Sequence, residues 1–107
     1  MNIDNAKQQM KKGVLELCVL SILHRGEAYP SDILNELHQA KILVVEGTLY
    51  PLLTRLKHNG LLQYRWVESG SGPPRKYYQL TEDGEKYFSA LTEAWTELAE
   101  LVSKAIS

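Results

Sequence analysis

Hydroxyl and guanidinium side chains gather on one side of a helix predicted over Glu46–Asn59. Its inward stripe is a set of leucines at positions i, i+3, i+4 and i+7, namely Leu49, Leu52, Leu53 and Leu56. The opposite side carries small, hydroxylic and cationic residues: Gly47, Thr48, Tyr50, Pro51 and Arg55. Hydroxyls near a helix N-terminus can contact phosphate, a guanidinium can bind phosphate or guanine, and a helix fits the major groove. This side is therefore a candidate surface for duplex DNA, with plain solvation as the alternative.

A second candidate surface lies in a predicted β-hairpin downstream. Apolar and polar residues alternate over residues 62–67, which is typical of a strand, and Arg75–Leu80 is expected to form the second strand. Residues 69–74 are expected to be the turn, since their prolines cannot donate to a ladder. Arg75 and Lys76 could neutralise phosphates, and a slim tip containing Gly72 suits the minor groove. The alternative is a solvated hairpin.

Groups that would perform catalysis or bind metal do not converge in the sequence. His24, His38 and His58 are scattered, and neither a glycine-rich phosphate loop nor metal-ligand spacing is present. The single cysteine, Cys18, cannot form an intramolecular disulfide and stands in an apolar run, as a core residue would. We therefore expect neither an enzyme nor a bound metal or other cofactor.

Two shorter helices are predicted ahead of Glu46. The run Val14–Leu23 is apolar at nearly every angle of a helix, which indicates burial on more than one side, and Gly26 ends it. The next helix begins near Pro30 and Ser31, because proline suits a first helical turn. With the hairpin, these elements indicate a mainly α fold of the winged helix-turn-helix class.

A long last helix is predicted after Thr81, which is a suitable N-cap residue. Its apolar residues are spaced 3, 4, 3, 4 and 3, as in a coiled-coil seam: Phe88, Leu91, Trp95, Leu98, Val102 and Ala105. So small a domain cannot cover this whole helix, so we expect a homodimer in which the seam packs against the first helix of the other subunit, with packing on its own domain as the alternative. Residues 1–80 would form the DNA-binding domain and residues 81–107 the dimerisation helix, together one compact unit.

The balance of positive and negative residues also differs between these two parts of the chain. Residues 1–80 carry 10 Lys/Arg and 7 Asp/Glu, whereas residues 81–107 carry 2 and 6. The first part could therefore meet a polyanion. Lysines precede Val14–Leu23 as in a signal peptide, but Glu16 interrupts that run, which is also too short to span a membrane. We expect a cytoplasmic protein without membrane contact.

Several segments together resemble the signature segments of the PadR family of regulators. They are GVLEL at 13–17, EGTLYPLLTRL at 46–56, GLL at 60–62 and RKYYQLTEDG at 75–84. The resemblance covers about residues 10–100 and, with the short last helix, implies the smaller branch of the family, with a single C-terminal dimerisation helix. Two positions depart from the pattern. Pro30 and Ser31 replace a Gly-Tyr pair, so Ser31 takes the tyrosine's place among residues expected to face DNA, and Val45 replaces a capping serine.

The resemblance implies a sequence-specific, DNA-binding transcriptional regulator. We expect a ligand-responsive repressor that acts as a homodimer on a pseudo-palindromic operator; the alternative is a winged-helix adaptor that binds proteins instead. Trp95 and its symmetry mate could sandwich a planar aromatic effector, as some smaller members of the family do. Glu16, the charge inside the first apolar run, could line such a site together with Leu17 and favour a cationic ligand.

Overall fold

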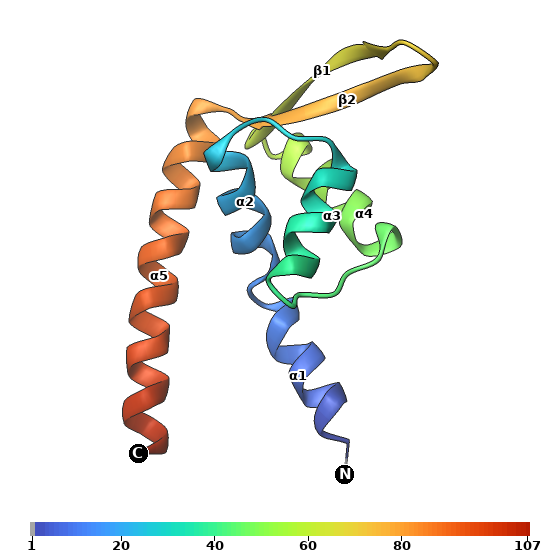
Figure 1. Cartoon of the computed structure of the whole chain (residues 1–107). Coiled ribbons are helices and arrows are strands. Elements are labelled where there is room, and N and C mark those ends of the chain that lie inside the picture. The colour runs from blue at the N-terminus through green and yellow to red at the C-terminus, as the bar shows by residue number, and fades with distance from the viewer. Residues whose placement is uncertain (1) are drawn as a thin grey trace.

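A small helical body carries a projecting hairpin and a long trailing helix. The computed structural model describes residues 2–107, which form five helices and one two-stranded antiparallel hairpin. In chain order these are α1 (Ile3–Lys12), α2 (Leu15–Arg25), α3 (Pro30–Gln39), α4 (Glu46–His58), β1 (Leu62–Ser69), β2 (Gly72–Leu80) and α5 (Glu82–Ile106) (Figure 1). The type and order of α2, α3, α4, the hairpin and α5 confirm the predicted fold class, and α1 is an additional helix.

The core lies among α2, α3 and α4. Its most deeply buried side chains are aliphatic and come from these three helices: Val19, Leu20, Ile33, Leu37, Leu49, Leu53 and Leu56. All four leucines of the predicted stripe on α4 are buried. The helix therefore presents its opposite side, with the hydroxylic and cationic residues, to solvent.

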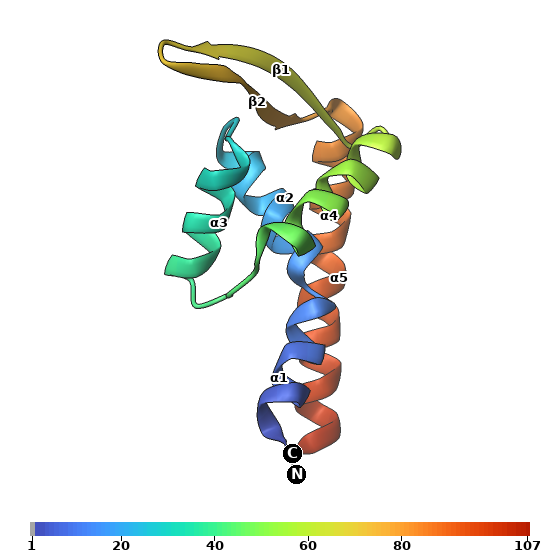
Figure 2. The same ribbon diagram turned by 90° about the vertical axis from the view of Figure 1, so that its right-hand side faces the viewer.

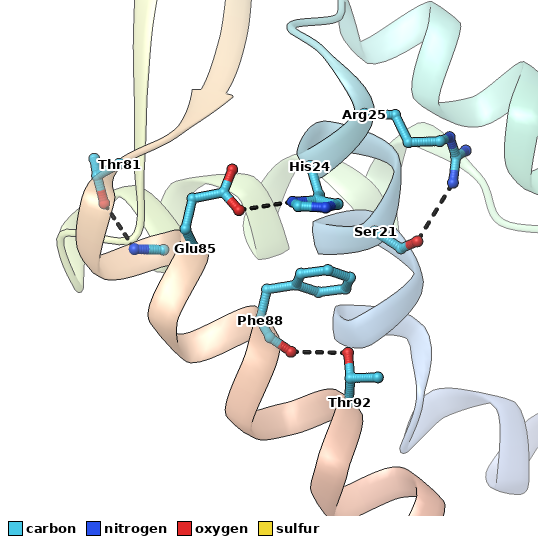
Figure 3. Close-up of polar contacts among 8 residues, drawn as sticks. Ser21, His24, Arg25, Thr81, Glu85, Phe88 and Thr92 are labelled. Carbon is cyan, nitrogen blue, oxygen red and sulfur yellow. Dashed lines mark hydrogen bonds and ion pairs between the residues drawn. The ribbon is translucent and has the colours of Figure 1, made fainter.

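Thr81 joins the end of α4 to the start of α5. The backbone N–H of Gly84 donates to Thr81 Oγ1 at 3.0 Å, which confirms the predicted N-cap (Figure 3). The same hydroxyl donates to the carbonyl of Gly60 at 2.6 Å, and the N–H of Thr81 donates to Leu61. Gly60 has a φ of 77°, in the left-handed region that favours glycine. One hydroxyl thus orients the long helix relative to the core.

The first turns of α5 pack on α2, and the rest of the helix extends past the body (Figures 1 and 3). His24 Nδ1 lies 2.6 Å from a carboxylate oxygen of Glu85, and its ring lies 4.8 Å from that of Phe88. Phe88 and Leu91 pack against the core, whereas Trp95 is 46% exposed and Leu98 52%. The predicted seam is therefore divided, since its first two residues contact their own subunit. Each helix within residues 2–107 is too short or too polar to cross a membrane.

The helix α1 was not predicted from the sequence. It begins at an N-cap, where the N–H of Asn5 donates to Asn2 Oδ1 at 3.2 Å, and it buries none of its own residues. Its apolar residues Ile3, Ala6 and Met10 are spaced as on one side of a helix, but they are few and stand among polar residues, so the pattern is short and weak. In both views α1 points toward the same end of the molecule as the C-terminal half of α5 (Figures 1 and 2).

The predicted turn over residues 69–74 was wrong. Strand β2 begins at Gly72 and includes Pro73 and Pro74, so that the turn is only Gly70 and Ser71. The register shifts between Val67 and Ser69, directly across from the two prolines. Prolines are tolerated at such an irregularity because the ladder there does not need their missing N–H.

Gly84→Ala should destabilise the fold by about 1–3 kcal/mol, because a Cβ at this position would overlap the carbonyl oxygen of Leu61. Gly47→Ala is the matched control, since its Cβ would enter open space in α4, and it should stabilise the protein by up to about 1 kcal/mol. Chemical denaturation followed by circular dichroism at one protein concentration measures both effects. Equal midpoints for Gly84→Ala and the wild type would contradict the close approach of α5 to Leu61.

Candidate nucleic-acid interface

The hairpin extends above α3 and α4 (Figures 1 and 2) and helps to enclose a concavity of about 470 Å³. Four residues that the sequence analysis assigned to DNA line it. Ser31 comes from the start of α3, Tyr50 from the exposed side of α4, and Arg75 and Lys76 from β2. The tertiary structure thus brings three separate predicted segments to one surface, with hydroxyls on one side and cations on the other.

Three further residues at this concavity were missed. Tyr29 precedes α3, Thr54 follows Tyr50 by one turn of α4, and Trp66 lies on β1. Trp66 meets the ring of Tyr64 edge-to-face at 5.9 Å. It is nevertheless 61% exposed. The alternation in the sequence places Trp66 and Tyr64 on one face of the strand but does not show how much of that face the helices cover.

The other predicted DNA residues are exposed but do not line this concavity. Gly47, Thr48, Pro51 and Arg55 lie along the free side of α4, and Gly72 follows the turn of the hairpin. Thr48 lines a second hollow, of about 330 Å³, together with Lys11 and Lys12 of α1. Within residues 2–107, no side chain caps the first amides of α4, as the replacement of serine by Val45 implied.

Arg55 has a partner that the sequence did not reveal. Its guanidinium lies 4.0 Å from a carboxylate oxygen of Glu16 on α2, and the two side chains are 60% and 28% exposed. The guanidinium predicted to bind phosphate or guanine therefore lies next to a negative charge of its own chain. A phosphate would have to compete with Glu16 for this cation.

The cations of the hairpin differ in their pairing. Arg65 donates to both carboxylate oxygens of Glu27, at 3.0 and 2.6 Å. These hydrogen bonds lower the pKa of Glu27 and raise that of Arg65, so both groups are charged at neutral pH. In the part of the chain that the structure describes, no carboxylate forms an ion pair with Arg75 or Lys76. The positive charge of the concavity is therefore available to an external anion.

The three predicted ligand residues do not meet within one subunit. Glu16 points to α4, whereas Leu17 lines a hollow of about 340 Å³ with Phe88, between α2, α3 and α5. Trp95 lies farther along α5, beside a separate shallow hollow. The predicted ligand site is formed by two chains at the centre of a dimer, so the separation of these residues within one chain leaves it a prediction.

Groups for hydrolytic or metal chemistry do not assemble at this surface. Across residues 2–107, no group of three or more His, Cys, Asp or Glu side chains could hold a metal ion. Cys18 is half-buried on α2, and burial raises the pKa of its thiol, which disfavours the reactive thiolate. The chemistry available at the concavity is the binding of an anion by cations, hydroxyls and aromatic rings.

The model of the transcriptional regulator PadR-like family matches residues 19–90 of this chain. A PadR-like transcription factor from Bacteroides fragilis is 56% identical, with 94% of this chain and 97% of that chain covered and a TM-score of 0.79. A PadR family regulator from Eggerthella lenta is 33% identical, with coverage of 98% and 92% and a TM-score of 0.92.

The fold is also similar to that of Bacillus subtilis PadR, whose structure was solved in complex with operator DNA. That chain is 24% identical to this one, with a TM-score of 0.68. The match covers 74% of this chain and 46% of that chain. At this identity the similarity concerns the fold alone.

Proposed function

The chain belongs to the PadR-like family of transcriptional regulators, as its sequence motifs predicted, and we propose that it binds duplex DNA through α4 and the hairpin. Family membership makes it a regulator and not an enzyme. The solvent-facing side of α4 enters the major groove, and the hairpin reaches the neighbouring backbone as a wing.

One observation carries this proposal: Arg75 and Lys76 stand at the same concavity as Ser31 and Tyr50. Hydroxyl groups can bind phosphate oxygens while unpaired cations replace the counterions of DNA, so a phosphodiester strand matches the chemistry of this surface. Bacillus subtilis PadR, a protein of similar fold, was solved in complex with operator DNA, which supports DNA as the partner. Gly47, Thr48, Pro51 and Arg55 would then read base edges or flanking phosphates, and Gly72 would lie at the minor groove.

A homodimer on a pseudo-palindromic operator is the second part of the proposal. The side of α5 beyond Leu91 exposes Trp95, Leu98 and Val102, and packing against a second copy of the chain would remove these side chains from water. Residues 1–80 would then bind DNA and residues 81–107 would dimerise, while Phe88 and Leu91 connect the two parts. Two-fold symmetry places the half-sites about 34 Å apart, one turn of DNA.

Regulation by a ligand is the third part. In the dimer, two exposed Trp95 rings near the symmetry axis could stack on a planar aromatic effector, and binding there would change the spacing of the two α4 helices. The chain would act as a repressor in the cytoplasm, where the chromosome lies and Cys18 remains a thiol. Leu17 would contact the ligand from the hollow that it lines with Phe88, and Glu16 would favour a cationic ligand in competition with Arg55.

Neutralising the wing should change the salt dependence of DNA binding. Arg75→Ala combined with Lys76→Ala is expected to lower the slope of log K against log[salt] by up to about 2, since two phosphate contacts are lost. Fluorescence anisotropy with a duplex selected from genomic fragments measures the slope. Lys86→Ala is the control, because Lys86 lies on α5 and pairs with Glu82 at 3.7 Å. A double variant with the wild-type slope would show that the wing does not touch phosphate. A wild-type protein that does not bind duplex DNA would favour the protein-binding adaptor.

Removing the charge of Glu16 should strengthen DNA binding through Arg55. Glu16→Gln frees the guanidinium, and because exposed ion pairs are weak the gain should be about two- to five-fold. The gain should disappear when Arg55 is also replaced by Ala, and Arg55→Ala alone should weaken binding. Glu36→Gln is the matched control, since Glu36 pairs with Arg25 at 3.2 Å. An equal gain from Glu16→Gln with and without Arg55 would show that Glu16 does not act through Arg55, and unchanged binding by Arg55→Ala would show that Arg55 does not contact DNA.

Charges on the exposed side of α5 should dissociate the dimer. Leu98→Glu and Val102→Glu are each expected to weaken association by about 3–5 kcal/mol if the carboxylate is buried unpaired. Thr96→Glu places the same charge two residues from Leu98, on another side of the helix, and should have little effect. Analytical ultracentrifugation measures the association. A wild-type protein that is monomeric at micromolar concentration would refute the dimer.

A further inference from the structure

The loop between α2 and α3 is attached to the hairpin at successive residues. Glu27 holds Arg65 through two hydrogen bonds. Ala28, which is buried, exchanges backbone hydrogen bonds with Tyr78, at 3.0 and 2.9 Å. An isolated two-stranded hairpin is marginally stable in water, so these contacts connect the wing to the helical body.

The attachment continues as a row of stacked side chains made of Arg65, Tyr77, Tyr29 and Arg75. The Arg65 guanidinium carbon lies 5.3 Å from the centre of the Tyr77 ring. Tyr77 stacks on Tyr29 with ring centres 3.8 Å apart and an angle of 14° between the rings. The guanidinium carbon of Arg75 then lies 5.3 Å from the centre of the Tyr29 ring. Interaction with the Tyr29 hydroxyl raises the pKa of Tyr77, so this ring stays neutral at physiological pH.

Lys76, the neighbour of Arg75, does not belong to this row. Its ammonium lies 4.5 Å from the centre of the Tyr64 ring and 5.2 Å from that of Trp66. Successive residues of a strand point to opposite faces of the hairpin. The two adjacent cations of the wing are thus supported by different sets of rings, and only Arg75 is connected to the start of α3.

We propose that Tyr29 and Tyr77 are positioning residues that hold Arg75 at the rim of the concavity for contact with a DNA phosphate. The proposal rests on the DNA-binding function proposed above and adds the way in which that contact is prepared. A guanidinium that is already ordered by aromatic faces loses less conformational entropy on binding than one that is mobile in solvent. In this role the two rings act through Arg75.

A double-mutant cycle tests whether Tyr29 acts through Arg75. Tyr29→Leu is expected to weaken DNA binding about three- to ten-fold and to lower the salt slope, and it should have no further effect when Arg75 is already Ala. In a Lys76→Ala background the same substitution should keep its full effect, since Lys76 is supported independently. Tyr77→Leu should behave like Tyr29→Leu, which protects the test if one of the two variants folds poorly.

A measurement without DNA completes the test. In nuclear magnetic resonance spectra of the unbound protein, the side-chain protons of Arg75 should be shifted by the ring of Tyr29. The shift should be lost in Tyr29→Leu and kept in Tyr29→Phe, which should also restore the affinity.

Additive losses for Tyr29→Leu and Arg75→Ala, or an Arg75 spectrum unchanged in Tyr29→Leu, would overturn the positioning role while DNA binding itself persists. A wild type that binds no duplex would instead overturn the proposed function, and the positioning role with it. The two failures are therefore distinguishable.

Discussion

Exclusion of water from the aliphatic side chains between α2, α3 and α4 is the interaction on which the other features of this protein depend. Leu20, Ile33, Leu37 and Leu53 belong to one buried cluster, and burial of each such side chain contributes about 1.5–3 kcal/mol. The cluster fixes the angle between α3 and α4. Once that angle is set, the start of α3 and the free side of α4 necessarily face the same concavity, and the polar residues there are held by a rigid support.

The same core leaves α5 incompletely covered. The first turns of the helix are attached by the close approach of Gly84 to Leu61 and by the contacts of His24 with Glu85 and Phe88. Beyond them the small body offers no further surface, so the remaining apolar side chains stay in contact with water. A helix of this kind gains stability only from a second molecule, which is the physical reason that the dimer belongs to the proposed function.

Two chemically similar arginines of the wing have opposite uses because of their positions. Arg65 is neutralised by Glu27 and joins the wing to the body, whereas no carboxylate of the described residues pairs with Arg75. Each contacts one ring of the stacked pair, Arg65 that of Tyr77 and Arg75 that of Tyr29. Internal ion pairing therefore separates a structural cation from one that can meet an anion, and the aromatic rings transmit the rigidity of the first to the second.

The sequence by itself determined the elements and their inner sides, because the spacing of apolar residues reflects which side of a helix or strand avoids water. It predicted the stripe of α4, the cap at Thr81, the hairpin and the family. Only the tertiary structure decided which element covers each side. Glu16 contacts Arg55 because α2 and α4, which are distant in sequence, approach each other. Trp66 remains exposed because the helices do not cover that part of the hairpin. Periodicity describes one element at a time, whereas these contacts arise between elements, so no pattern along a single segment contains them.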